Sequence, residues 1–321
     1  MNNKDKKKLM IKLFNTNLDI SKFKNMKFKD TIDEFFYRIR AKASPGNTNY
    51  MKGKLPRIKE YMGERFVNEI DEHALSEFTY YLHSRPTKPC NRTINKYRDL
   101  VVRIIKDITG RHIYHEALSF TEPDIIPIDE YDIKIIIEFL VTNIKKYHNE
   151  KYLLIILLFL DTGVRINELV NIRKDMIDIN NRSIRLLVTK TSKNRTIFFT
   201  ETTKKLLVDY IPKLDDESLY LFPGLKPNTH LRTESVYRAL VRIGNRLNIN
   251  ASIRPHLWRH THAMTYLLHG GDLRSLQLQL GHVSIKTTER YLHMADKTRK
   301  KQYDSTFEGI YASTALRNVV I

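Results

Sequence analysis

Apolar residues recur at helical spacing through the first third of the chain. Ile32, Phe35, Phe36 and Ile39 form an i, i+3, i+4, i+7 stripe, which predicts a helix there. The same spacing predicts helices over 47–62, 74–84 and 91–109. No strand pattern competes in this part, so we expect a small all-helical bundle with basic faces.

The pattern after residue 128 mixes helices with short strands. Asp129 can cap a helix over 130–147, and a very apolar helix over 149–162 ends at Gly163. Strands are predicted over 176–179, 183–188 and 195–200. Further helices are predicted over 164–172, 201–213, 232–247, 256–269, 273–280 and 284–294, before a weak segment over 298–318. The fold class is therefore mainly α with a small antiparallel β-sheet.

A lapse in periodicity between these two parts, with Pro123 and Pro127 in an acidic stretch, indicates a linker. We expect a basic N-terminal arm (1–27), a helical domain (28–112), a linker (113–127), a mixed domain (128–297) and a C-terminal tail (298–321).

Charge points to a polyanionic partner. The chain has 55 Lys and Arg against 36 Asp and Glu, a net charge of +19. Residues 1–120 hold 25 basic and 14 acidic side chains, and residues 121–321 hold 30 and 22, so the excess is not confined to one tail. Nucleic acid is the commonest such partner. The alternative is a basic protein that its charge keeps in solution.

Other classes are excluded. The single cysteine, Cys90, excludes an intrachain disulfide framework and a multi-cysteine zinc site, and favours a reducing, cytoplasmic setting. The longest apolar run, Tyr152–Leu160, is far shorter than the roughly 20 residues that span a bilayer. The Lys-rich start lacks the apolar segment of a signal peptide. We therefore expect a soluble protein.

Polar residues gather at the ends of predicted elements. Arg165 follows the Gly163 break, and Glu168, one turn on, either orients its guanidinium or forms an ordinary surface pair with it. Lys190 and Lys193 lie in the connection before the last strand. Either lysine can reach into a cleft from there, or lie on a solvated hairpin tip.

Two later clusters have the same character. His256 and Arg259 share one helix face and can grip one ligand together. His256 and His260 have the spacing of a zinc pair, but no Glu stands between them and no further ligands are evident, so we expect no metal. His260 is more often a core or interface histidine. Gly281 ends the helix over 273–280, which places His282 in a tight turn before a helix that carries Tyr291.

These segments together resemble the tyrosine recombinase (lambda-integrase) family over residues 160–295. They are Thr162-Gly-Val-Arg165-Ile-Asn-Glu168-Leu, Pro255-His256-Leu-Trp-Arg259-His260-Thr, and Leu280-Gly281-His282 followed nine residues later by Tyr291. The resemblance implies an all-helical, SAM-like core-binding domain and an α+β catalytic domain. Residues 28–112 are compatible with the former, but their sequence alone would not identify it.

The resemblance also implies a site and a reaction. Its catalytic residues would be Arg165, Lys190, His256, Arg259, His282 and the nucleophile Tyr291. The tyrosine would attack a DNA phosphate and form a 3′-phosphotyrosyl link while the 5′-hydroxyl leaves, with no metal, cofactor or ATP. The two arginines would clamp the non-bridging oxygens, Lys190 would protonate the leaving oxygen, and His282 would donate to the phosphate. His256 would handle the tyrosine proton.

Two departures from the family pattern bear on these roles. The turn Thr-Lys190-Thr-Ser-Lys193-Asn lacks the family's glycines, which leaves the choice between the two lysines open. Trp258 stands where an aliphatic residue, usually Leu, precedes the second arginine, and we expect it to be tolerated packing.

The implied partner is double-stranded DNA with specific recombination sites, on which the protein would assemble as a tetramer. Accessory DNA-bending proteins are further candidate partners. Our candidate DNA-binding residues are Arg92, Lys96, Arg103, Lys193 and Arg195. The tail after Tyr291 would dock on a neighbouring protomer or pack in cis. Phage integration, transposition and dimer resolution stay open as roles. A type IB topoisomerase and a non-catalytic DNA-binding regulator are the rival readings.

Overall fold

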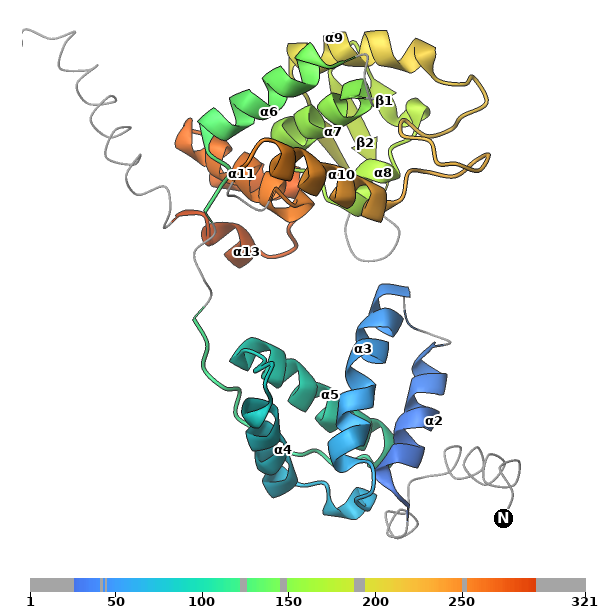
Figure 1. Ribbon diagram of the computed structural model, residues 1–321, viewed down its shortest axis with the longest axis vertical. Coiled ribbons are helices and arrows are strands. Elements are labelled where there is room, and N and C mark those ends of the chain that lie inside the picture. The colour runs from blue at the N-terminus through green and yellow to red at the C-terminus, as the bar shows by residue number, and fades with distance from the viewer. Residues whose placement is uncertain are drawn as a thin grey trace, which may run out of the picture. The chain divides into compact units, whose positions relative to one another are not determined.

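The chain divides into two compact units, Met1–Pro123 and Asp124–Ile321, each with its own core (Figure 1). A computed structural model describes residues 26–40, 43, 45–121, 126–144, 149–187, 194–249 and 253–292. The expected arm lies almost wholly outside these residues, and the expected tail lies entirely outside them. Among the described residues, no helix is both long and apolar enough to cross a membrane.

The first unit is a helical bundle, as its periodicity predicts. Its helices are α2 (Phe28–Arg40), α3 (Pro45–Met62), α4 (Glu72–Ser84) and α5 (Asn91–Thr109), with a 3₁₀ turn at Val67–Glu69 between α3 and α4. The stripe residues Ile32 and Phe35 are fully buried, and α5 buries the apolar face that contains Ile94, Val101 and Ile105. Helix α5 ends at Gly110, whose φ of 70° is the left-handed geometry of a helix C-cap.

Part of the expected linker packs against this unit. Ile113 is buried in the helical core, and Leu118 packs on it. The Asn95 side chain exchanges two hydrogen bonds of 2.9 Å with the backbone N–H and C=O of Leu118. The segment up to Ser119 is thus fixed on α5 by hydrogen bonds that the loss of periodicity does not reveal.

The second unit is built around α7 (Asn149–Thr162), which contacts α6 (Glu130–Thr142), α9 (Glu201–Tyr210), α11 (Pro255–Leu268) and the sheet. Its near-continuous apolar sequence follows from this position, because a helix that is covered on several sides has little polar face to show to water. Asp129 caps α6 through its carboxylate, as predicted, but α6 ends at Thr142 rather than residue 147.

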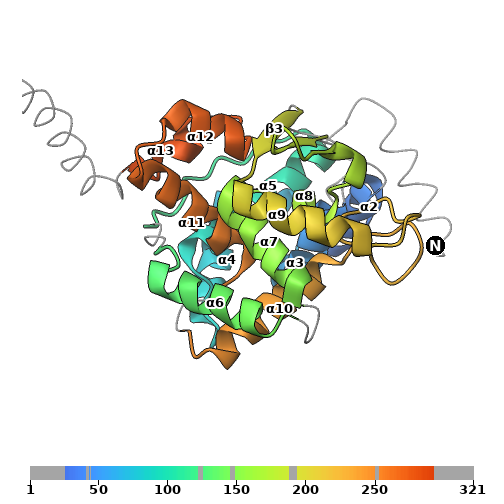
Figure 2. The ribbon, with the colours of Figure 1, turned by 90° about the horizontal axis from the view of Figure 1, so that it is seen from above.

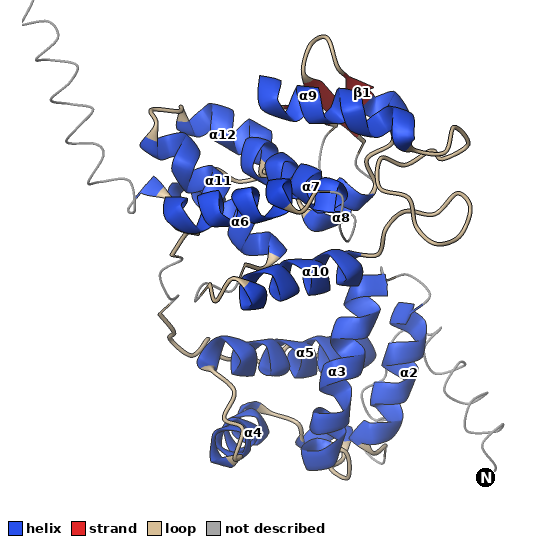
Figure 3. Cartoon of the chain, turned by 45° about the horizontal axis from the view of Figure 1, so that its top comes forward, coloured by secondary structure: helices blue, strands red, loops and turns tan. Residues whose placement is uncertain are grey.

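A small antiparallel sheet completes this unit (Figure 3). Its strands are β1 (Ile177–Asp178), β2 (Ser183–Leu186) and β3 (Arg195–Phe198), in that order. Ile184 pairs with Ile177 on one side and Ile197 on the other, and the buried face of the sheet carries Ile184, Leu186 and Ile197. The mainly helical fold with a small sheet is therefore confirmed.

Three further helices follow α10 (Thr233–Arg246), and most of the predicted catalytic residues lie on them or in the turns beside them. They are α11, α12 (Leu273–Leu280) and α13 (Lys286–Glu289), which lie side by side in Figure 2. Asp272 caps α12, and Gly281 ends it with φ 64°, as predicted. The helix predicted over 284–294 is not continuous in the described residues: α13 covers only Lys286–Glu289, and Tyr291 lies in the turn that follows.

Candidate active site

Arg165 stands where α7 gives way to the short helix α8 (Ile166–Val170). Gly163 turns the chain with φ 58°, and Arg165 is the N-cap of α8. Its backbone N–H donates to Glu168 Oε2 at 3.0 Å, and its Nη1 donates to Glu168 Oε1 at 3.2 Å. The Glu168 side chain is only 17% exposed, so it orients the guanidinium from within the protein instead of forming an ordinary surface pair.

Arg195, which we expected to bind DNA, is held inside the protein. Its side chain is 8% exposed and donates from Nη1 and Nη2 to the two carboxylate oxygens of Glu168, at 2.9 and 2.7 Å. Its Nε donates to the carbonyl of Gln279 in α12. The placement of β3 against α12 aims this side chain inward, so its guanidinium is occupied by protein groups. Burial alone would raise the pKa of Glu168, but its hydrogen bonds to Arg195 and the positive charges around it hold that pKa at about 2.

Arg259 lies deeper than Arg165 and is 5% exposed. It donates from Nη1 to the carbonyl of Gly163 at 2.6 Å, and from Nη2 to the carbonyl of Leu280 at 2.7 Å. Arg165 Nη2 donates to the next carbonyl, that of Gly281, at 3.4 Å. The two guanidiniums, 94 positions apart in sequence, therefore converge on one turn. Burial, then repulsion from Arg165, lowers the pKa of Arg259 to about 9.

His282 follows that turn directly. Its Nδ1 lies 2.9 Å from the Thr288 hydroxyl in α13, and its carbonyl accepts from Gln277 Nε2. Burial, then the charges of Arg259 and Arg165, lowers the pKa of His282 to about 4. The imidazole is therefore neutral at pH 7 and stands within the electrostatic field of both arginines.

Tyr291 is buried in a small apolar cluster with side chains of α11 and α12. It is 2% exposed and packs with Ala263, Met264, Leu267, Leu276 and Leu280. Burial raises its pKa, while the nearby charges of Arg259 and Arg290 act in the opposite direction. The structure thus brings Tyr291 to the side of α11 that also carries Arg259.

The residue that contacts the Tyr291 hydroxyl is one to which the sequence analysis gave no catalytic role. His260 Nδ1 lies 2.6 Å from Tyr291 Oη, and the two ring centroids are 5.6 Å apart. His256, to which we assigned the tyrosine proton, is exposed on the first turn of α11. The only available signal was the position of His260 beside Arg259, which is equally compatible with a core residue. The neighbouring His262 is such a residue, since its Nδ1 contacts the Leu160 carbonyl at 2.6 Å in the interior.

The structure leaves the other predicted residues untested as site residues. Lys190 and Lys193 lie outside the described residues. Arg92, Lys96 and Arg103 belong to the first unit, where they are exposed on α5.

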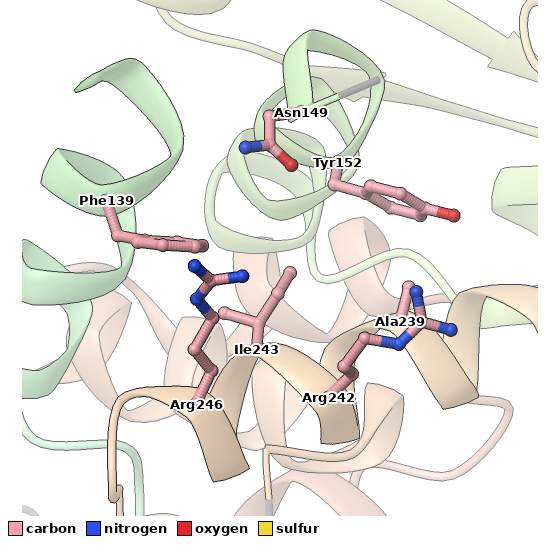
Figure 4. Close-up of a pocket in the computed structure, with 7 residues that line it drawn as sticks. All are labelled: Phe139, Asn149, Tyr152, Ala239, Arg242, Ile243 and Arg246. Carbon is pink, nitrogen blue, oxygen red and sulfur yellow. The ribbon is translucent and has the colours of Figure 1, made fainter. Parts of the chain in front are cut away.

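Within the described residues, no group of three or more His, Cys, Asp or Glu is placed to hold a metal ion. A pocket of about 190 Å³ lies between α6, α7 and α10 (Figure 4). Phe139, Tyr152, Arg242 and Arg246 are among its lining residues, and none of the predicted site residues lines it.

Sequence comparisons relate the chain to a family and to named proteins. Residues 128–298 match the model of the phage integrase family. Tyrosine recombinase XerA of Saccharolobus solfataricus is 39% identical over 151 residues, which are 47% of this chain and 48% of that protein. Tyrosine recombinase XerC of Lactobacillus leichmannii is 32% identical over 162 residues, 48% of this chain and 54% of that protein. The chain thus spans about half the length of the curated relatives it matches.

Solved structures show a similar fold over most of the chain. The Tn1549 transposon integrase in complex with a circular intermediate DNA is 15% identical, with a TM-score of 0.71, and covers 87% of this chain and 100% of its own. A lambda integrase dimer bound to a COC′ core site is 13% identical, with a TM-score of 0.63 over 90% of this chain and 85% of its own. At these identities the likeness concerns the fold.

Proposed function

The chain belongs to the phage integrase family of tyrosine recombinases, and on that premise we propose that it is a site-specific DNA recombinase. It cuts one strand by forming a 3′-phosphotyrosyl bond with Tyr291 and rejoins the strand to a new partner. The bond energy is kept in the protein–DNA link, so rejoining needs no ATP.

The observation that carries this proposal is the convergence of two guanidiniums on the turn that precedes the tyrosine. Arg259 and Arg165 donate to the adjacent carbonyls of Leu280 and Gly281. Attack on a phosphodiester builds negative charge on its non-bridging oxygens, and arginine forks stabilise such charge through paired hydrogen bonds. Both side chains are already fixed by the protein, so little reorganisation is needed when the charge develops.

The other predicted residues act on the attacking oxygen, on the leaving oxygen and on the phosphate. Tyr291 Oη forms the new bond to phosphorus, and the 5′-oxygen leaves with a proton from Lys190. His282, neutral and held near both arginines, donates a hydrogen bond to a phosphate oxygen. His256, exposed at the start of α11, contacts the DNA backbone at the edge of the site.

DNA is bound by both units. The exposed Arg92, Lys96 and Arg103 of α5 contact phosphates, so affinity falls steeply as salt rises. A tetramer on two sites, coupled through the C-terminal tail, performs the exchange. The exchange serves phage integration, transposition or dimer resolution, and the DNA sequences that the protein captures will distinguish these roles.

A suicide substrate tests the proposal. Nicked fragments of the source organism's genomic DNA are incubated with the protein. After attack, the short fragment that carries the freed 5′-hydroxyl diffuses away, which traps the covalent adduct. We expect adducts on a few specific sequences, attached through Tyr291. Relaxation of any supercoiled plasmid by the monomer would instead identify a topoisomerase, and specific binding with no adduct would identify a non-catalytic regulator.

A further inference from the structure

One close contact of the nucleophile is left unexplained by the proposed function. His260 lies on the second turn of α11 and places Nδ1 2.6 Å from Tyr291 Oη. Tyr291 is 2% exposed, so water has little access to its hydroxyl. His260 is the histidine whose ring nitrogen is within hydrogen-bond distance of this oxygen among the described residues.

Burial and neighbouring charges determine whether the side chains of His260 and Tyr291 are protonated. Burial, followed by the positive charge of Arg290 and contributions from His256 and Arg259, lowers the pKa of His260 to about 4. The imidazole is therefore neutral at pH 7 and has one nitrogen that donates and one that accepts. Tyr291 keeps its proton as well, because burial raises its pKa. A neutral phenol and a neutral imidazole thus share one proton between Oη and Nδ1.

We propose that His260 is a catalytic residue, the base that takes the phenolic proton of Tyr291 at Nδ1. This rests on the proposed function. As Oη bonds to phosphorus, the O–H bond breaks and its proton moves to Nδ1, while the 5′-oxygen leaves with a proton from the general acid. The histidine becomes an imidazolium, and it returns the proton to Tyr291 Oη when a 5′-hydroxyl attacks the phosphotyrosine to rejoin the strand.

The charges around His260 make this transfer depend on bound DNA. Arg290 after α13, together with Arg259 and His256 in α11, disfavours an imidazolium in the free protein. A phosphodiester bound between the arginines brings negative charge, which compensates these cations and raises the proton affinity of His260. The base is therefore weak until a phosphate occupies the site, and Tyr291 stays protonated in the absence of DNA.

Two substitutions separate proton transfer from packing. His260→Asn places an amide near the position of Nδ1, so it keeps a hydrogen-bonding group but has no usable basicity, and His260→Ala removes both. His269→Asn is the matched control, because His269 lies at the C-cap of the same helix and is exposed. Thermal unfolding of each variant verifies that it folds.

The rate of adduct formation against pH is the first readout, on a nicked fragment that the unsubstituted protein captures. General-base catalysis contributes roughly 10²-fold or more, so His260→Asn should lose about that factor at pH 7. Burial raises the pKa of Tyr291 above its ordinary value of about 10, so the deficit should shrink only at pH values above that, where phenolate forms without a base. A rate that equals the unsubstituted one, or a deficit that is the same at every pH, would overturn the proposal.

A second readout needs no DNA, and so it decides the proposal even if no fragment is captured, an outcome that would count against the proposed function alone. Nitrogen-15 NMR of labelled histidine, assigned with His260→Asn, reports which ring nitrogen carries the proton. We expect His260 to carry it on Nε2 and to accept from Tyr291 at Nδ1. A proton on Nδ1 would make His260 a donor to the phenol and would overturn its role as the base.

Discussion

Glu168 binds Arg195 through two parallel hydrogen bonds, of 2.9 and 2.7 Å, and binds Arg165 through the same two oxygens. The carboxylate therefore links strand β3 to the N-cap of α8. The turn at Gly281 packs closely against the Arg195 side chain, since a Cβ at Gly281 would lie 2.9 Å from the Arg195 guanidinium carbon. Arg195 thus fixes the position of Arg165 through Glu168 and through the turn.

Removal of the shared carboxylate should destabilise the protein. Glu168→Gln leaves the 8% exposed Arg195 without its counter-charge, and loss of one partner of a buried pair costs about 3 kcal/mol. Urea unfolding at pH 7 measures this. Glu150→Gln is the control, because it removes the partner of the more exposed Lys213 and should cost at most about 1 kcal/mol. Equal effects would show that Glu168 is not a structural link.

Arg259→Lys should impair cleavage far more than binding. A lysine ammonium cannot reach both the Gly163 and the Leu280 carbonyls and also present a flat fork to the phosphate. Loss of such a preorganised donor typically lowers rates by about 10²–10³. Adduct formation on the captured fragment measures the rate, and a gel-shift titration measures binding. A rate within a few fold of the unsubstituted protein would argue against a role in stabilising charge.

Tyr291→Phe should abolish the covalent adduct and leave DNA affinity nearly unchanged. The substitution removes one hydroxyl from a 2% exposed ring and keeps the shape of the apolar cluster around it. Its stability cost should stay near 1 kcal/mol, the value of a single hydrogen bond, here that to His260. Denaturing gels detect the adduct. An adduct that persists in this variant would place the nucleophile elsewhere.

Gly163→Ala should destabilise the second unit. The residue has φ 58°, and an added Cβ would lie 2.5 Å from His262 Cδ2 and 2.6 Å from Leu280 Cδ2. The backbone penalty alone is about 1–2 kcal/mol, and the clash adds to it. Gly53→Ala, inside α3 with nothing near its Cβ, should instead stabilise its helix by about 0.5–1 kcal/mol. Thermal unfolding of both variants tests the opposite signs.

Stability should fall as the pH drops from 6.5 to 4. The pKa values of His260 and His282 are lowered to about 4 from 6.5, chiefly by burial, so the unfolded chain binds more protons in this window. Unfolding then becomes easier with acidification, by at most about 1.4 kcal/mol per pH unit for each histidine. The contribution is complete above pH 6.5 and is lost through this range. Urea unfolding against pH should show a shallower slope in His282→Asn, and an unchanged slope would contradict the assignment.

Part of the site could be predicted from the sequence, because it depends on residues that are close together in the chain. Arg165 and Glu168 are one turn apart, so their pairing needs only a helix. The C-caps at Gly163 and Gly281 follow from the freedom of glycine to adopt positive φ, and both are found. The continuous helix expected around Tyr291 was wrong, because α13 ends at Glu289 and Tyr291 lies in the turn after it.

The sequence by itself determined which faces are apolar, roughly where most of the helices lie, and which residue types resemble a recombinase site. These follow from interactions between residues close in the chain. Only the tertiary structure decided that Arg195 points inward to Glu168 and that His260, rather than His256, contacts Tyr291. Each of these contacts joins side chains from different elements, and the packing of those elements sets which side chains meet.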